Sequence, residues 1–206
     1  MKKIVLIIVA AFMMMPAVSQ AQTSAYAKAL KKEVKQKTKE LTKGGWEIFG
    51  SARTIEVALA KHYARLESNE KDLVGIVGTA PRFTSKNVGH QMAFSSAANQ
   101  YALMTSGTVR GLVENNSSSD GANTANEVDN FIASYIREVE SSVKGELEES
   151  FSVIREIEPG VYEMQSFFIV NKNSDSEAKI RALKNAAKEN AVSAELTQKL
   201  VNAFTK

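Results

Sequence analysis

The sequence of 206 residues contains no cysteine, and this absence excludes several functions at once. Disulfide bonds and nucleophilic thiolates both require cysteine side chains. The lipid-accepting cysteine of a bacterial lipoprotein is missing for the same reason. We therefore expect a protein that is not lipid-anchored and that folds without covalent cross-links.

Histidine is almost as scarce, since His62 and His90 are the only two in the chain. No His-x3-His or Glu-x2-His pair places two metal ligands on one helical face. The serines lack the Gly-x-Ser-x-Gly turn that exposes a nucleophile, and Gly75-x2-Gly78 is too short for a dinucleotide-binding loop. The glutamates of segment 146–149 are expected to lie on a solvated strand face, without the partner that a glycosidase needs. We therefore expect no metal, no cofactor and no enzymatic activity.

The first 21 residues have the three parts of a cleavable signal peptide. Lys2 and Lys3 supply positive charge, Ile4–Pro16 is apolar, and residues 19–21 form a small-x-small cleavage site. The apolar run is shorter than the ~20 residues that cross a membrane. We therefore predict export in a Gram-negative bacterium, to the periplasm or the outer envelope, with no membrane span after cleavage.

Basic charge is concentrated in one segment, because seven lysines lie between residues 28 and 43 against Glu33 and Glu40. The chain as a whole carries only +3. We expect the lysines to cover more than one face of a helix and to contact lipid headgroups, lipopolysaccharide or another anionic envelope polymer. Nucleic acid is not expected as a partner. The residues chosen for this contact are Lys28, Lys31, Lys32, Lys35 and Lys39. The alternative interpretation is a solvated spacer, because this helix has few apolar residues.

Apolar periodicity predicts the secondary structure of the remaining chain. Helices are expected over residues 25–43, 51–66, 87–114, 123–141 and 175–204, the last with a break near 190–193. Strands are expected over residues 73–84, 147–157 and 161–170, and a polar loop over 115–122. Pro159-Gly160 fits a type II turn, so the last two strands are expected to form a hairpin.

The order of these elements after residue 70 is β-α-α-β-β-α, which indicates an α+β domain. We expect a three-stranded antiparallel or mixed sheet with packed helices, preceded by two N-terminal helices. The predicted organisation is a signal peptide over 1–21, a lysine-rich helix and linker over 22–45, and one α+β domain over 46–206. Trp46 is expected to anchor the linker to that domain.

Several segments carry a resemblance to known families. These are the strand 74–78, the alanine-rich helix 93–102 and the hairpin segment 160–164. Over about residues 73–172 the chain resembles the twenty-kilodalton outer-membrane lipoprotein family. The lysine-rich helix ending at Gly44-Gly45-Trp46, with the helix after it, is similar to uncharacterised exported proteins of Gram-negative anaerobes. The first resemblance implies an envelope location and a non-catalytic role, and neither supplies functional residues.

Together these expectations describe an exported, envelope-associated, non-enzymatic protein that serves as an interaction or structural module. Its partner is expected to be an envelope protein or an anionic envelope polymer. The alternative is a small-ligand-binding protein or a hydrolase that uses a groove between the sheet and the helices. The oligomeric state is left open.

Overall fold

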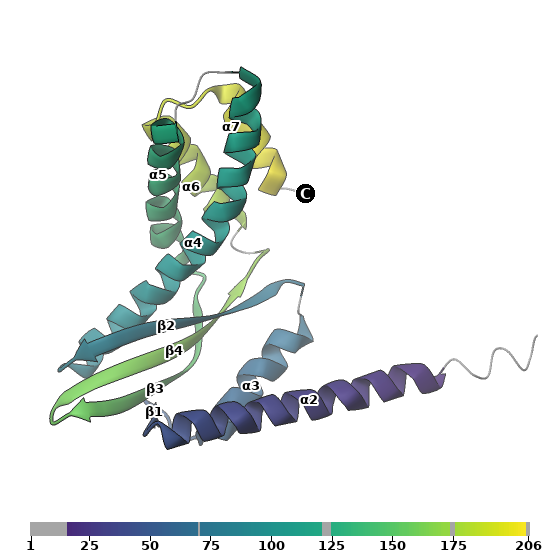
Figure 1. The fold of residues 1–206 in the computed structure, drawn as a ribbon, viewed down its shortest axis with the longest axis vertical. Helices are drawn as coiled ribbons and strands as arrows, with labels where there is room; N and C mark the ends of the chain where they lie inside the picture. Colours follow the sequence, from purple (N-terminus) through teal and green to yellow (C-terminus); the bar gives the residue numbers. More distant parts are fainter. Residues whose placement is uncertain (1–15, 70, 121–124, 174–175, 205–206) are drawn as a thin grey trace, which may run out of the picture.

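The structure is a computed structural model, and it describes residues 16–69, 71–120, 125–173 and 176–204 (Figure 1). Most of the predicted signal peptide lies outside the described residues. Within them, six helices and four strands form an α+β fold. In chain order the elements are α2 (Pro16–Lys43), β1 (Glu47–Phe49), α3 (Ile55–Ser68), β2 (Leu73–Phe83), α4 (Lys86–Asp120), α5 (Ala125–Val143), β3 (Glu148–Glu158), β4 (Val161–Asn171), α6 (Ser176–Glu189) and α7 (Ala194–Phe204).

The four strands form one antiparallel sheet in the order β1-β3-β4-β2. The prediction of a three-stranded sheet preceded by two N-terminal helices is therefore wrong, because strand β1 lies between those helices and joins the sheet. Strand β1 pairs with Ser152–Ile154 of β3. Its three residues are too few to show the alternation that identifies a strand in a sequence.

The predicted hairpin is confirmed, with β3 and β4 joined at Pro159-Gly160. Gly160 has a φ of 73°, the left-handed conformation that a type II turn requires and that glycine adopts without strain. Two irregularities in the β3–β4 register, at Glu149/Phe151 and at Glu156/Glu158, interrupt the simple alternation expected for β3. Such bulges redirect the side chains that follow them.

Helices cover both faces of the sheet. On one face, Phe151, Val153 and Phe167 belong to a cluster with apolar residues of α2 and α3. On the other face, Ile154 and Met164 pack with residues of β2 and the first half of α4. Because both faces are buried, residues 151–154 of β3 are all buried and the strand does not alternate with solvent.

Helix α4 lies very close to the sheet because the row of residues below it has small side chains. Gly78, Ser166 and Ser152 occupy that row in adjacent strands. A Cβ atom on Gly78 would lie 1.9 Å from the carbonyl oxygen of Ala93 in α4. A real Cβ atom cannot approach an oxygen that closely, so only glycine fits here.

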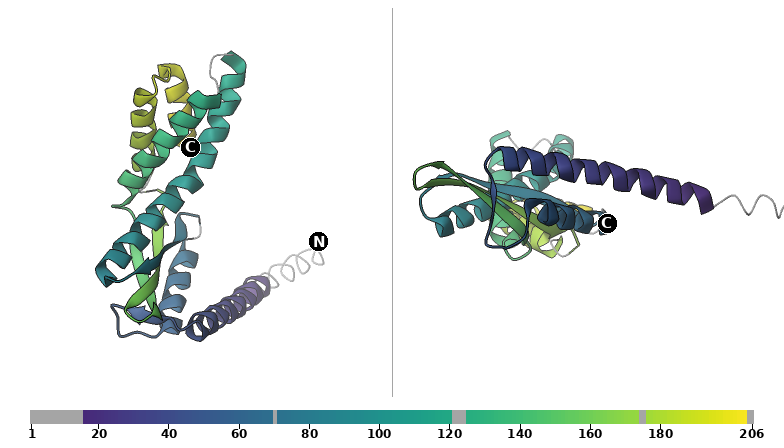
Figure 2. Two further views of the ribbon diagram at one scale, coloured as in Figure 1. Left: turned by 60° about the vertical axis from the view of Figure 1, so that its left-hand side comes forward. Right: turned by 90° about the horizontal axis from the view of Figure 1, so that it is seen from below.

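The second half of α4 packs with α5, α6 and α7 in a group of helices at one end of the sheet (Figures 1 and 2), and the core of this group includes Ile76, Phe168 and Val170 of the sheet. Helix α4 is longer than predicted and runs to Asp120, through most of the expected loop at 115–122. The expected break at 190–193 is confirmed, because α6 ends at Glu189 and α7 begins at Ala194.

The predicted role of Trp46 as an anchor is also confirmed. Helix α2 ends at Gly44-Gly45, where Gly45 has a φ of 75° and the Trp46 amide donates to the carbonyl of Leu41. The Trp46 ring is buried, and the Arg155 guanidinium lies 4.8 Å from its centroid. Arg155 also donates to the Gly44 carbonyl, 2.9 Å away, so this link fixes the end of α2 to β3.

Candidate functional site

Five lysines of α2 form a single stripe along the helix. Each residue of an α-helix turns by about 100° around the axis, so five of the seven lysines fall within a sector of about 80°. These five, which we call the lysine stripe, are Lys28, Lys32, Lys35, Lys39 and Lys43. Lys31 flanks the stripe by about 40° and Lys37 lies on the opposite side. The seven lysines therefore occupy more than one side of α2, with five of them in the stripe.

Apolar packing holds the stripe away from the body of the protein. Val34 and Leu41 of α2 are buried in the cluster with α3 and the sheet, and Leu30 packs at its edge. These three residues lie roughly opposite the stripe around the helix axis. All five stripe lysines are exposed, as is Lys31. Packing therefore sets which side of α2 faces outward.

Helix α2 also extends past the rest of the molecule. Figure 1 and both views of Figure 2 show its first half leaving the side of the sheet and α3 as an arm. The described contacts of α2 are mainly with α3. The lysine stripe thus runs from the packed end of the helix towards the projecting end.

The charge of the stripe is not compensated within the described part of the chain. The arginines contrast with it, since Arg65, Arg82 and Arg110 each pair with an acidic side chain. Lys37, on the other side of α2, also pairs with Glu40 at 2.7 Å. No stripe lysine has an ion pair among the described residues. An anion that meets this face therefore competes with no internal carboxylate salt bridge.

Three stripe lysines also border a depression between α2 and the start of α3. This depression has a volume of about 350 Å³, and we call it the basic hollow. Its lining residues are Lys35, Thr38, Lys39, Thr42, Lys43 and Glu56. The hollow is therefore lined by three lysines, two threonines and one glutamate.

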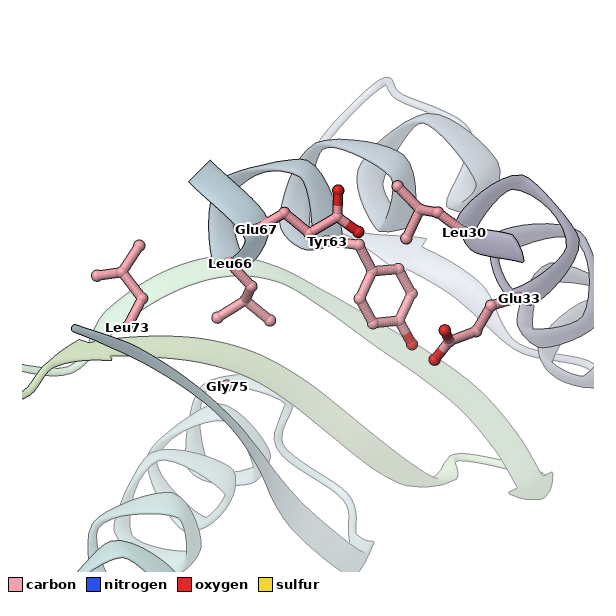
Figure 3. Close-up of a pocket in the computed structure, with 7 residues that line it drawn as sticks. All are labelled: Leu30, Glu33, Tyr63, Leu66, Glu67, Leu73 and Gly75. Carbon is pink, nitrogen blue, oxygen red and sulfur yellow. The ribbon is translucent and has the colours of Figure 1, made fainter. Parts of the chain in front are cut away.

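A second pocket, of about 260 Å³, lies between α2, α3 and the start of β2 (Figure 3). Its apolar walls come from Leu30, Leu66, Leu73 and Gly75, and its polar groups are Glu33, Tyr63 and Glu67. In Figure 3 the Tyr63 ring points towards Glu33 across the pocket. Burial raises the pKa of Tyr63, and the carboxylates of Glu33 and Glu40 raise it further. The phenol is therefore held neutral and is a poor nucleophile at neutral pH.

His62 is a buried structural residue. Its ring lies edge-on to Tyr63, Phe151 and Phe167, and its Nδ1 lies 2.9 Å from the Ser150 hydroxyl. Burial lowers the pKa of His62 from 6.5 to about 4. The side chain is consequently neutral at pH 7, and folding depends on keeping it neutral.

This burial predicts a loss of stability in acid. Between the unfolded pKa of 6.5 and the folded pKa of about 4, the unfolded chain binds the extra proton. The free energy of unfolding should therefore fall as the pH falls through this range, by about 2 to 3 kcal/mol from His62 alone. Urea unfolding at a series of pH values measures this slope. His62→Gln should flatten the slope between pH 6.5 and 4. Equal slopes in the wild type and His62→Gln would contradict the assignment.

His90 heads a polar chain on the other face of the sheet. Its Nε2 lies 2.7 Å from Glu149, which accepts a hydrogen bond from Ser152, and Ser152 contacts Ser166 at 2.6 Å. Both serines are buried. A catalytic triad needs the histidine beside the serine, but here the carboxylate lies between them. These contacts therefore stabilise polar groups below α4, and they do not make Ser152 or Ser166 a nucleophile.

The described residues hold no group of three or more histidine, cysteine or acidic side chains that would bind a metal ion. Within the same part of the chain, no helix combines the length and the apolar character needed to span a membrane. The residues chosen from the sequence for anion contact did not include Lys43, Thr38, Thr42 or Glu56. The helical spacing of 28, 32, 35, 39 and 43 would have found Lys43, but the hollow depends on the packing of α3 against α2.

Comparison with protein-family models, curated proteins and solved structures finds no match for this chain. The chemistry of the surface is therefore the basis for a functional proposal.

Proposed function

We propose that this protein is an exported, non-enzymatic envelope module that binds an anionic surface through the lysine stripe of α2. The observation that supports this function is the one-sided placement of five exposed lysines without carboxylate partners among the described residues. A solvated spacer has no physical need for such an arrangement, and it would be equally well solvated with mixed charges. The one-sidedness favours a surface contact over the spacer interpretation.

The expected mode of binding is electrostatic. Each lysine near an anionic membrane surface contributes about 1 kcal/mol of attraction, so five lysines at one face contribute about 5 kcal/mol. Between residues 27 and 43 the stripe side of α2 carries no large apolar side chain. Stable insertion into lipid needs such side chains, and we therefore expect reversible contact at the level of the headgroups.

The envelope location is supported by the signal-peptide pattern of the first 21 residues. The resemblance of residues 73–172 to the twenty-kilodalton outer-membrane lipoprotein family points to the same compartment. Because the chain has no cysteine, it cannot be retained there through a lipidated cysteine. The lysine stripe offers a non-covalent means of retention.

Co-sedimentation with vesicles tests this proposal. The protein should bind vesicles that contain anionic lipid at about 25 mM salt and should leave them at about 500 mM, because salt screens exposed charges. Vesicles of neutral zwitterionic lipid serve as the control and should not bind. Equal binding at both salt concentrations, or equal binding to both vesicle types, would show that the stripe charge is not the cause.

The alternative, a small-ligand-binding protein or a hydrolase with a groove between sheet and helices, has weaker support. Apolar clusters occupy both faces of the sheet. The pocket of Figure 3 contains Glu33, Glu67 and Tyr63, and the raised pKa of the Tyr63 hydroxyl makes it a poor nucleophile at neutral pH. No observation on the described residues favours this alternative over surface binding.

A further inference from the structure

The basic hollow has a charge that selects among anions. Lys35, Lys39 and Lys43 contribute three positive charges and Glu56 contributes one negative charge. The local charge is therefore +2. Successive lysines are four residues apart, so their Cα atoms follow one another along α2 at intervals of about 6 Å. The three ammonium groups can surround one compact anion.

Thr38, which lines the hollow, has a buried hydroxyl without a hydrogen-bond partner among the described residues. An unsatisfied buried hydroxyl costs about 1 to 3 kcal/mol. Threonine has two accessible χ1 rotamers in a helix, so rotation between them changes the direction in which this hydroxyl points. Thr42, which is exposed, adds a second hydroxyl at the rim.

We propose that the basic hollow binds a phosphomonoester headgroup on the anionic surface that α2 contacts. A phosphomonoester carries about −1.5 to −2 charges at pH 7 and has three strong acceptor oxygens. This charge and these acceptors match three ammonium donors with a net local charge of +2. A phosphodiester carries a single charge and leaves half of the local charge unbalanced. This inference rests on the proposed function and specifies its ligand class.

Substitution of Glu56 tests whether a charge change in the hollow alters phosphomonoester affinity in the expected direction. Its carboxylate lines the hollow and repels an entering phosphate. Glu56→Gln should therefore strengthen phosphomonoester binding, whereas Lys39→Gln should weaken it. Few surface substitutions predict a gain of binding, so the opposite signs of these two variants make the test specific to this site.

The experiment compares vesicles of phosphatidylcholine that contain either phosphatidic acid, a phosphomonoester, or phosphatidylglycerol, a phosphodiester. The two lipids are mixed to equal surface potential. We expect about tenfold tighter binding to the phosphatidic acid vesicles, the effect of about one charge-assisted hydrogen bond. Lys39→Gln should reduce this preference to below about twofold, and Glu56→Gln should increase it by a similar factor.

Two further variants separate the hollow from the rest of the stripe. Lys28→Gln lies on the stripe outside the hollow, so it should weaken binding to both vesicle types and keep the preference. Thr38→Val should reduce the preference without lowering the midpoint of thermal unfolding, because it removes an unpartnered buried hydroxyl. A loss of stability in Thr38→Val would show that this hydroxyl serves the fold and would overturn its assigned role.

Three outcomes would overturn the inference. Binding that is equal for both vesicle types but still sensitive to salt would contradict the phosphomonoester site. The proposed binding to anionic surfaces would then still hold. No binding to either vesicle type would remove both proposals. If free glycerol 3-phosphate binds as tightly as the vesicle-borne headgroup, a soluble ligand and not a surface occupies the hollow.

Discussion

With all five stripe lysines replaced by glutamine, the protein is expected to bind anionic vesicles more weakly by about 3.5 orders of magnitude. Each lysine contributes about 1 kcal/mol near an anionic surface, and about 1.4 kcal/mol corresponds to a tenfold change in affinity. Glutamine has nearly the helix propensity of lysine, so α2 should remain helical. Vesicle co-sedimentation at about 25 mM salt measures the loss, and circular dichroism measures the helix content.

Lys37→Gln is the matched single control for this prediction. Lys37 lies on the opposite side of α2 and pairs with Glu40 at 2.7 Å. Its replacement should change vesicle affinity by less than about twofold, whereas Lys35→Gln should lower it by about fivefold. If the two single variants behave alike, the position of the lysines on the helix does not matter and the stripe has no special role.

Replacing Gly78 with alanine is expected to reduce the free energy of unfolding by more than about 4 kcal/mol. The new Cβ atom would lie 1.9 Å from the carbonyl oxygen of Ala93 and 2.9 Å from the Cβ of Ala97. The closest atom belongs to the backbone of α4, so a side-chain rotation cannot relieve the overlap. The helix would have to move away from β2, and the contacts on this face of the sheet would be lost. Chemical unfolding monitored by fluorescence of Trp46 measures the effect.

Gly107 of the same helix provides the control. A Cβ atom added there would meet no atom within 4 Å among the described residues. Gly107→Ala should therefore stabilise the protein by up to about 1 kcal/mol, because alanine is the better helix former. If Gly78→Ala lowers the free energy of unfolding and Gly107→Ala raises it, the close approach of α4 to the sheet determines the effect at position 78, and the loss of a glycine does not. A Gly78→Ala variant as stable as the wild type would show that α4 does not lie so close to the sheet.

Local chemistry made some parts of the fold predictable. Pro159-Gly160 specifies a turn by itself, and this turn placed the β3–β4 hairpin correctly. Gly44-Gly45 ends α2 where the sequence indicated, because glycine accepts the left-handed conformation of Gly45. The few apolar residues of α2 form the packed side of the helix, although their scarcity had favoured a solvated spacer.

Other features depend on contacts between distant segments and were not predictable from patterns. Strand β1 has three residues, and only its pairing with Ser152–Ile154 identifies it as a strand. The basic hollow exists because Glu56 of α3 lies beside Lys39 and Lys43 of α2. The requirement for glycine at position 78 arises from the path of α4 across the sheet. Each of these features is determined by tertiary packing, which the helix and strand propensities of individual residues do not predict.

The central claim is that the position of the lysines, and not the total charge of the protein, determines binding. One comparison tests this claim most directly. A variant with the five stripe lysines changed to glutamine is compared with a second variant in which five exposed lysines elsewhere are changed. The second set is Lys61, Lys71, Lys144, Lys184 and Lys188.

Both variants lose five positive charges, so their net charges are identical. Binding to anionic vesicles at about 25 mM salt is then measured for both. The stripe variant should bind more weakly by about 3.5 orders of magnitude, while the second variant should keep its affinity within about fivefold of the wild type. Equal losses in the two variants would contradict the proposed function of α2.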